Sequence, residues 1–195
     1  MKKYELIESN KVSPKGMPLF QVVALRDFGT VMKGDKGGYI ESEANLSHEK
    51  NCWVYDSAQV FGNARVHGSA RVYGSAWVYN SARVFGTAQV YGSARIYSTA
   101  WVYDSAQVFD DARVHGNARV YGDAQVYGNA QVYGDVWVYG GRAFATKNDH
   151  WDITEVDNGD GTATLYADAT FKPVELKLCH GGQTGKFCSE CGEKL

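Results

Sequence analysis

The sequence predicts an all-β solenoid, and three observations support this fold class. First, a six-residue unit with the consensus Ala-(Arg/Gln/Trp)-Val-(Tyr/Phe/His)-Gly-(Ser/Asn/Thr/Asp) occurs fifteen times in succession from Cys52 to Gly141. Units repeated at a short fixed period are typical of proteins in which each unit buries its apolar face only against its neighbours. Second, the residues alternate as in a strand and then reach a turn of the Gly-Ser type. Third, a period of six fits neither the 3.6 nor the 3.5 residues of a helical repeat.

The inward positions of the unit are nearly uniform. One slot holds thirteen alanines from Ala58 to Ala130, and the other holds fourteen valines together with Ile96. Complete burial of one valine side chain contributes roughly 1.5–3 kcal/mol before conformational entropy is subtracted. We therefore expect a narrow core of constant width that runs along the whole array.

The unit resembles the repeat of the hexapeptide-repeat family, in which a small residue is followed two positions later by an aliphatic one. Ala70-Arg-Val72 and Ala118-Arg-Val120 match this pattern, although here an aromatic residue follows the aliphatic one. The resemblance implies a left-handed parallel β-helix with three hexads, about 18 residues, in each coil. Five to six coils follow when the imperfect hexads from Ile40 are included. Residues 19–66 are also similar to uncharacterised hexapeptide-repeat proteins of phages and prophages, which implies a phage or prophage origin.

The chain divides into three predicted parts: an N-terminal cap (1–39), the solenoid (40–141) and a C-terminal module (142–195). A cap is expected because the end of a solenoid exposes strand edges and open core. Between Leu46 and Val54 the aliphatic slot shifts by two residues, which predicts a two-residue insertion at one corner. Residues 150–178 predict further β-strands around the turn at 157–161.

Outward residues 18 positions apart are expected to stack on one face of the solenoid. The first ladder holds Trp53, Arg71, Gln89, Gln107 and Gln125, and the second holds Gln59, Trp77, Arg95, Arg113 and Gln131. The third, called the Arg/Trp column here, holds Arg65, Arg83, Trp101, Arg119 and Trp137. Its guanidinium and indole groups can bind an anionic or planar ligand through cation–π contacts and charge-assisted hydrogen bonds. Alternatively, these side chains only stack on one another.

Fifteen aromatic or histidine side chains occupy the fourth position of the unit and form three further columns. Rings repeated at the spacing of the coils can simply pack on each other. They also add more outward apolar surface than a lone monomer usually exposes. We therefore expect a homo-oligomer or a protein partner that covers part of this surface.

The family resemblance raises acyl transfer as an alternative function. Related acyltransferases use a histidine as general base in a site between subunits. A loop that interrupts the repeat lies beside this site. His67 and His115 are the histidines of the array, but they fall in different columns and the array is unbroken. Because general-base catalysis needs a positioned acceptor as well as an imidazole, we predict a non-enzymatic protein with no catalytic residues.

The last residues predict a structural zinc site. Cys188-Ser-Glu-Cys191-Gly resembles one knuckle of a zinc ribbon, and Cys179 with His180 supplies a second pair of ligands. We expect one zinc ion on these four residues, with no open position for catalysis. The alternative is a knuckle that holds no metal, or one that takes a further ligand from His150 or from another chain.

Composition limits the remaining function classes. The formal net charge of −2 argues against a protein held to nucleic acid by bulk electrostatics. No apolar run suggests a membrane span or a signal peptide, so we expect a cytoplasmic location, in the host if the protein is phage-encoded. We predict a non-catalytic scaffold or binding protein that contacts a protein partner or itself, with interference with a host factor as one extension. Acyl transfer and binding of nucleotides or single-stranded nucleic acid on the Arg/Trp column remain the alternatives.

Overall fold

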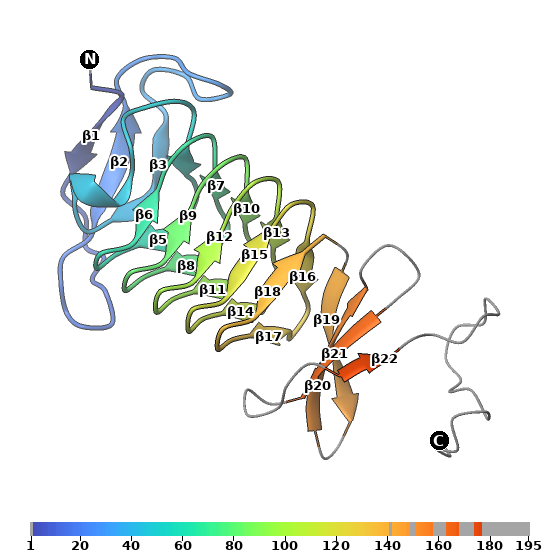
Figure 1. The fold of residues 1–195 in the computed structure, drawn as a ribbon. Coiled ribbons are helices and arrows are strands. Elements are labelled where there is room, and N and C mark those ends of the chain that lie inside the picture. The colour runs from blue at the N-terminus through green and yellow to red at the C-terminus, as the bar shows by residue number, and fades with distance from the viewer. Residues whose placement is uncertain (1, 141, 149–150, 158–162, 168–173, 177–195) are drawn as a thin grey trace.

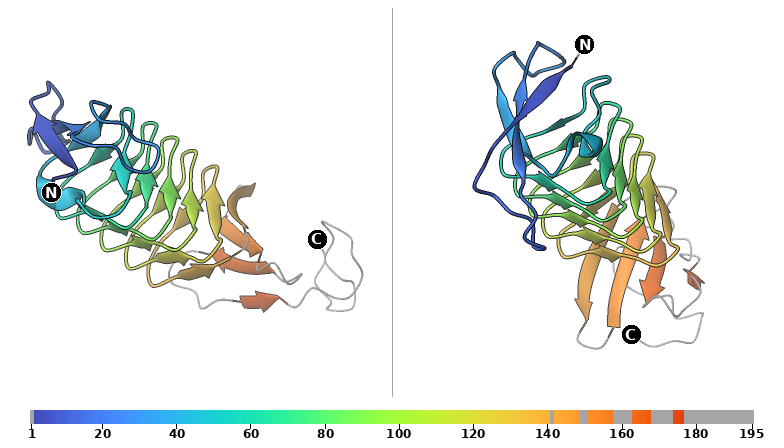
Figure 2. Two further views of the ribbon diagram at one scale, coloured as in Figure 1. Left: turned by 90° about the horizontal axis from the view of Figure 1, so that it is seen from above. Right: turned by 90° about the vertical axis from the view of Figure 1, so that its left-hand side faces the viewer.

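A computed structural model describes residues 2–140, 142–148, 151–157, 163–167 and 174–176, with side chains over 2–140. These residues form an all-β rod with one short 3-10 helix, η1 (Glu43–Asn45), and no α-helix among them. The coils stack along one axis, with the N-terminal segment at one end and β19 to β22 at the other (Figures 1 and 2). The predicted all-β parallel solenoid of about six coils is confirmed. No helix in the described part has the length and apolar character needed to cross a bilayer.

Three sheets form the three faces of the rod. The eight-stranded sheet contains, in order, β1 (Tyr4–Ile7), β2 (Phe20–Ala24), β3 (Lys36–Ile40), β5 (Gln59–Val60), β8 (Trp77–Val78), β11 (Arg95–Ile96), β14 (Arg113–Val114) and β17 (Gln131–Val132). The nine-stranded sheet contains β22 (Val174–Leu176), β21 (Ala163–Ala167), β20 (Trp151–Asp157), β19 (Arg142–Asn148), β16 (Gln125–Tyr127), β13 (Gln107–Val108), β10 (Gln89–Val90), β7 (Arg71–Val72) and β4 (Trp53–Val54). The five-stranded sheet contains β18 (Trp137–Tyr139), β15 (Arg119–Tyr121), β12 (Trp101–Val102), β9 (Arg83–Val84) and β6 (Arg65–Val66).

Parallel pairing at an offset of 18 residues builds the regular part of the rod. Gln59 pairs with Trp77, Trp77 with Arg95, and Arg95 with Arg113. The inward alanines from Ala58 to Ala130 are all fully buried, and so are nearly all the valines. The repeat therefore produces the narrow continuous core that its two inward slots predict.

The first coil is two residues longer than the others. Ile40 pairs with Val60, and Leu46 forms a bridge with Val66, so both offsets are 20 residues. The predicted two-residue insertion before Val54 is thus present. Asn45 of η1 stabilises this irregular corner, because its side-chain amide donates to the carbonyls of Gly62 and Ala64 at 2.8 and 2.9 Å.

Each corner of the rod needs a residue in the left-handed region of φ. The slot after the aromatic residue is glycine in most hexads, but Asp56, Asp104 and Asp110 also adopt φ between 51° and 57° there. Their carboxylates accept hydrogen bonds from the backbone N–H of the glycine one coil further on, at 3.0, 3.4 and 3.2 Å. These bonds compensate for a backbone conformation that is otherwise costly for residues with a Cβ.

The N-terminal segment covers the first coil. β1 and β2 form an antiparallel hairpin, β2 pairs with β3, and β3 joins the eight-stranded sheet through β5. Lys3 is fully buried, and its Nζ donates to the Cys52 carbonyl at 2.8 Å and contacts Cys52 Sγ at 3.3 Å. Burial lowers the pKa of Lys3 and raises the pKa of the Cys52 thiol.

Trp53 differs from its predicted position. It occupies an outward slot of the repeat, yet it is only 1% exposed, because the N-terminal segment packs over it. Its ring lies edge-on to Phe28 and Tyr4, at centroid distances of 5.2 and 6.1 Å. The outward ladder on this face therefore begins at Arg71, one coil later than the repeat predicts.

Beyond the last hexad, the nine-stranded sheet continues. β19 pairs in parallel with β16, but Arg142 lies opposite Gln125, so the offset shortens to 17 residues. β20 and β21 then follow as an antiparallel pair in which Asp157 lies opposite Ala163. This pairing confirms that strands flank the predicted turn at 157–161.

Candidate functional site

The Arg/Trp column lies along the five-stranded face, and the ladder places its five residues in one line. The guanidinium carbon of Arg83 lies 5.1 Å from the Trp101 ring, and that of Arg119 lies 4.7 Å from both Trp101 and Trp137. Four members thus form a continuous alternating stack. Arg65 continues the line without an aromatic neighbour in it.

No acidic side chain of the described residues neutralises the positive charge of this column. Among the described residues, the ion pairs are Lys2 with Glu43 and His48 with Glu43, both in the first fifty residues. Arg65, Arg83 and Arg119 therefore have no carboxylate within 4 Å there. Stacking on tryptophan holds Arg83 and Arg119 in place and leaves their charge available to a partner.

The aromatic slot forms three columns of stacked rings. Tyr73, Tyr91 and Phe109 stack with centroids 4.8 Å apart and their planes within 3° of parallel. The hydroxyls of Tyr73 and Tyr91 also donate to the side-chain carbonyls of Gln89 and Gln107. Except for the buried Phe61 and the exposed Tyr139, the rings are half-buried by their neighbours along the rod. This packing is the simpler of the two predicted arrangements.

His67 and His115 are members of these stacks. His67 stacks on Phe85 at 4.8 Å, and His115 lies between Tyr97 and Tyr133 at 4.6 and 5.2 Å. Burial lowers the pKa of both imidazoles, with a further contribution from Arg83 and Arg65 at His67 and from Arg113 at His115. The two histidines follow different strands, β6 and β14, so the structure does not bring them together.

The lowered histidine pKa predicts a pH-dependent stability. An unfolded histidine takes up a proton near its ordinary pKa of about 6.5, before the folded one does, so stability falls as pH decreases through this range. Replacing His115 with tyrosine, the residue on either side in its column, should reduce the loss of melting temperature between about pH 8 and pH 5. Tyr97→Phe is the control in the same column. An unchanged pH dependence in His115→Tyr would contradict this account.

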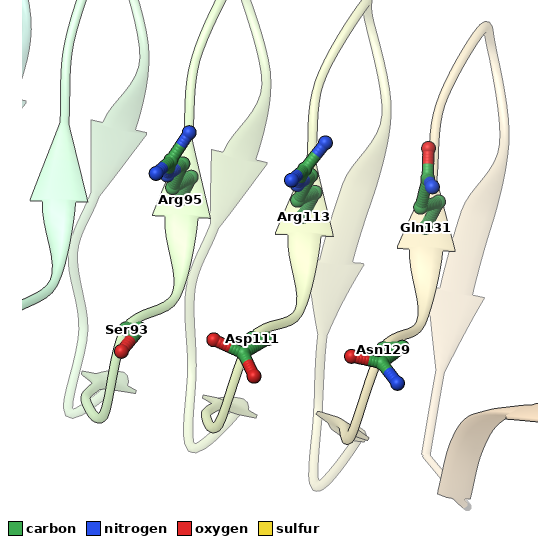
Figure 3. A pocket seen from close by; sticks show the side chains of 6 residues that line it. All are labelled: Ser93, Arg95, Asp111, Arg113, Asn129 and Gln131. Carbon is green, nitrogen blue, oxygen red and sulfur yellow. The ribbon is translucent and has the colours of Figure 1, made fainter.

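A groove parallel to the rod axis runs along the eight-stranded face. One wall consists of the turn residues Ser93, Asp111 and Asn129, and the other consists of the strand residues Arg95, Arg113 and Gln131 (Figure 3). The groove has a volume of about 270 Å³ and crosses three successive coils. We call it the axial groove. The repeat predicts the ladder of Arg95, Arg113 and Gln131. It does not predict the opposite wall, because the residues after each glycine are expected only to form turns and not to line a groove.

The predicted zinc ligands Cys179, His180, Cys188 and Cys191 lie outside the described residues. Within the described part, no three His, Cys, Asp or Glu side chains cluster in a way that would hold a metal ion. The zinc site therefore stays a prediction.

Comparison with known proteins supports the assignment of the repeat. The family model described as the YdcK beta solenoid repeat matches residues 58–74, 106–122, 112–128 and 124–140. The array is a β-solenoid of six-residue repeats, parts of which are similar to this family model. Over 63 residues, this chain is 38% identical to a protein of Escherichia coli strain K12 described as the uncharacterized acetyltransferase YdcK. The matched stretch covers 29% of this chain and 19% of that relative, so it spans about a fifth of the relative's length.

Proposed function

We propose that this β-solenoid is a non-catalytic binding rod that presents the Arg/Trp column to an acidic surface of a protein partner. The observation that carries the proposal is the alternating stack of Arg83, Trp101, Arg119 and Trp137, which contains no compensating acid among the described residues. A stacked arginine loses less side-chain entropy when it binds than a free one, because its position is already restricted.

The composition of the column suits a protein interface. Arginine and tryptophan are enriched among the residues that contribute most to protein–protein affinity. Five rungs at about 4.8 Å extend roughly 19 Å along the rod, a length that a single strand or helix of a partner can follow. The uncompensated guanidinium groups favour a partner with carboxylates along that element.

Capture experiments with matched variants test this proposal. A partner retained from lysate by the wild-type protein should be lost in Arg119→Ala, because one change removes a charge and two ring contacts. Arg71→Ala is the control, because Arg71 is likewise an outward arginine of the repeat but lies on the nine-stranded face. Quantified binding should weaken by about tenfold or more in Arg119→Ala. Equal retention by the two variants would refute the role of the column.

Self-association is the other form of this proposal, and native mass measurement distinguishes it. If the partner is a second copy, the wild-type protein and Arg71→Ala should have the mass of an oligomer, and Arg119→Ala the mass of one chain. If all three have the mass of one chain, the partner is a different protein.

Acetyl transfer is the second candidate function, favoured by the description of the similar protein and by the environment of His115. Burial and the neighbouring Arg113 lower the pKa of His115, and a neutral imidazole can accept a proton from an acceptor hydroxyl or amine. Release of free thiol from acetyl-coenzyme A in the presence of an acceptor, lost in His115→Phe but kept in His67→Phe, would support this function.

A further inference from the structure

The turn residues that line the axial groove form one corner of the rod, and they differ from those of the other two corners in their side-chain hydrogen bonds. At one of those corners, Thr99, Asn117 and Asp135 form a chain of hydrogen bonds along the axis, with 2.9 Å between Asn117 Nδ2 and Asp135 Oδ1. At the other, Thr87 and Ser105 are 3.3 Å apart. In the groove, no described side chain bonds to Ser93, Asp111 or Asn129, so their polar atoms face the groove without a protein partner.

The opposite wall carries two like charges in adjacent coils. Arg95 and Arg113 are paired in the ladder, about 4.8 Å apart along the axis, and neither has a carboxylate within 4 Å among the described residues. Arg95 lies 5.1 Å from the Trp77 ring. Arg113 has no aromatic contact of this kind in the described structure. Repulsion between the two guanidinium groups is relieved by an anion placed between them.

The two walls together select the chemistry of a ligand. The arginine pair binds a carboxylate, whereas the Asp111 carboxylate repels an anionic group placed against the turn wall. Asp111, Asn129 and Ser93 instead accept hydrogen bonds from hydroxyl groups. A ligand with one carboxylate and several hydroxyls on each unit satisfies both walls.

We infer that the axial groove binds an acidic oligosaccharide, with a uronate carboxylate on Arg95 and Arg113 and sugar hydroxyls on Asp111, Asn129 and Ser93. The groove volume of about 270 Å³ is just below the roughly 300 Å³ at which small-molecule sites begin. It therefore holds one or two sugar units, and the rest of the chain continues along the rod. Polar groups repeat at each coil of the groove, which suits a polymer that runs parallel to the axis.

This site does not depend on the protein partner proposed above. The groove belongs to β11, β14 and β17 on the eight-stranded face, whereas the Arg/Trp column belongs to the five-stranded face. Arg119→Ala should therefore bind an oligosaccharide as the wild-type protein does. Failure of the groove proposal leaves the partner proposal for the Arg/Trp column untouched, and the reverse also holds.

Calorimetric titration with trigalacturonate tests the inference, with neutral maltotriose as the matched sugar. We expect the full-length protein to bind trigalacturonate and not maltotriose. Arg113→Gln should weaken binding by about tenfold or more, because a charged hydrogen-bond donor is lost, and Arg71→Gln should leave it unchanged. Absence of trigalacturonate binding at millimolar concentration, or equal weakening in both variants, would overturn the inference.

The sign of the Asp111→Ala effect separates a sugar site from a patch of positive charge. If Asp111 accepts sugar hydroxyls, its removal weakens trigalacturonate binding. If the groove attracts only charge, removing a carboxylate strengthens binding of trigalacturonate and of triglutamate alike. Strengthening of both ligands in Asp111→Ala would overturn the assignment to a saccharide, and so would wild-type affinity for triglutamate equal to that for trigalacturonate.

Discussion

Replacement of Trp53 with alanine should lower the free energy of unfolding by about 3–5 kcal/mol, the range for truncation of a buried tryptophan. Trp53 is 1% exposed and joins the N-terminal segment to the first coil through Phe28 and Tyr4. Gly37 permits this packing, because a Cβ at Gly37 would lie 2.9 Å from the Trp53 ring. Chemical denaturation gives the free energy, and hydrogen exchange should show β1 and β2 opening before the coils.

Trp137→Ala is the control for this change. Trp137 occupies the same slot of the repeat but is 57% exposed and contacts Arg119 and Tyr121. Its truncation should cost less than about 1 kcal/mol. If the two variants lose similar stability, Trp53 does not hold the cap on the rod.

Gly86→Ala should destabilise the rod by about 2–4 kcal/mol, through two effects that act together. Gly86 has φ of +71°, and an added Cβ would lie 2.7 Å from the backbone nitrogen of Asp104 and 2.9 Å from its Cα. Backbone atoms of the next coil cannot move away without breaking the parallel ladder between β9 and β12. The melting temperature and the urea midpoint should both fall.

Gly128→Ala separates the two effects. Gly128 has φ of +64°, but no atom of the described residues lies within 4 Å of a Cβ built there. Only the cost of the left-handed conformation applies, roughly 1–2 kcal/mol. If Gly128→Ala is as unstable as Gly86→Ala, the contact between the added Cβ and Asp104 contributes nothing to the destabilisation by Gly86→Ala.

The repeat predicts most of the fold because the residue type at each of its six positions has a local structural cause. Alanine and valine alternate with polar residues, and glycine or aspartate follows where the chain must turn, so strand positions, coil length and inward residues all follow from the period. The two-residue shift between Leu46 and Val54 likewise locates the longer first coil. These features depend on residues near each other in sequence or exactly one coil apart.

The candidate sites follow from the sequence only in part. The ladder places Arg83, Trp101 and Arg119 in one line, but their ring contacts depend on side-chain rotamers that a period does not determine. The axial groove depends on a turn column that lies beside a strand column. Its distinguishing property is that the side chains of Ser93, Asp111 and Asn129 lack, within the described part of the chain, the side-chain hydrogen bonds made at the other corners.

The repeat in the amino-acid sequence is enough to predict the all-β class, the coil of 18 residues, the buried alanines and valines, and the columns in which outward residues stack. The three-dimensional packing buries Trp53 and places Lys3 against Cys52, neither of which the repeat predicts. It also leaves the side chains of Ser93, Asp111 and Asn129 without a hydrogen-bond partner among the described residues. The physical reason is the range of the interactions. Stacking in a solenoid repeats one relation between residues a coil apart, and the period of the sequence encodes it. The cap instead packs through segments outside the repeat, and the hydrogen bonds of the groove side chains depend on rotamers that the period does not determine.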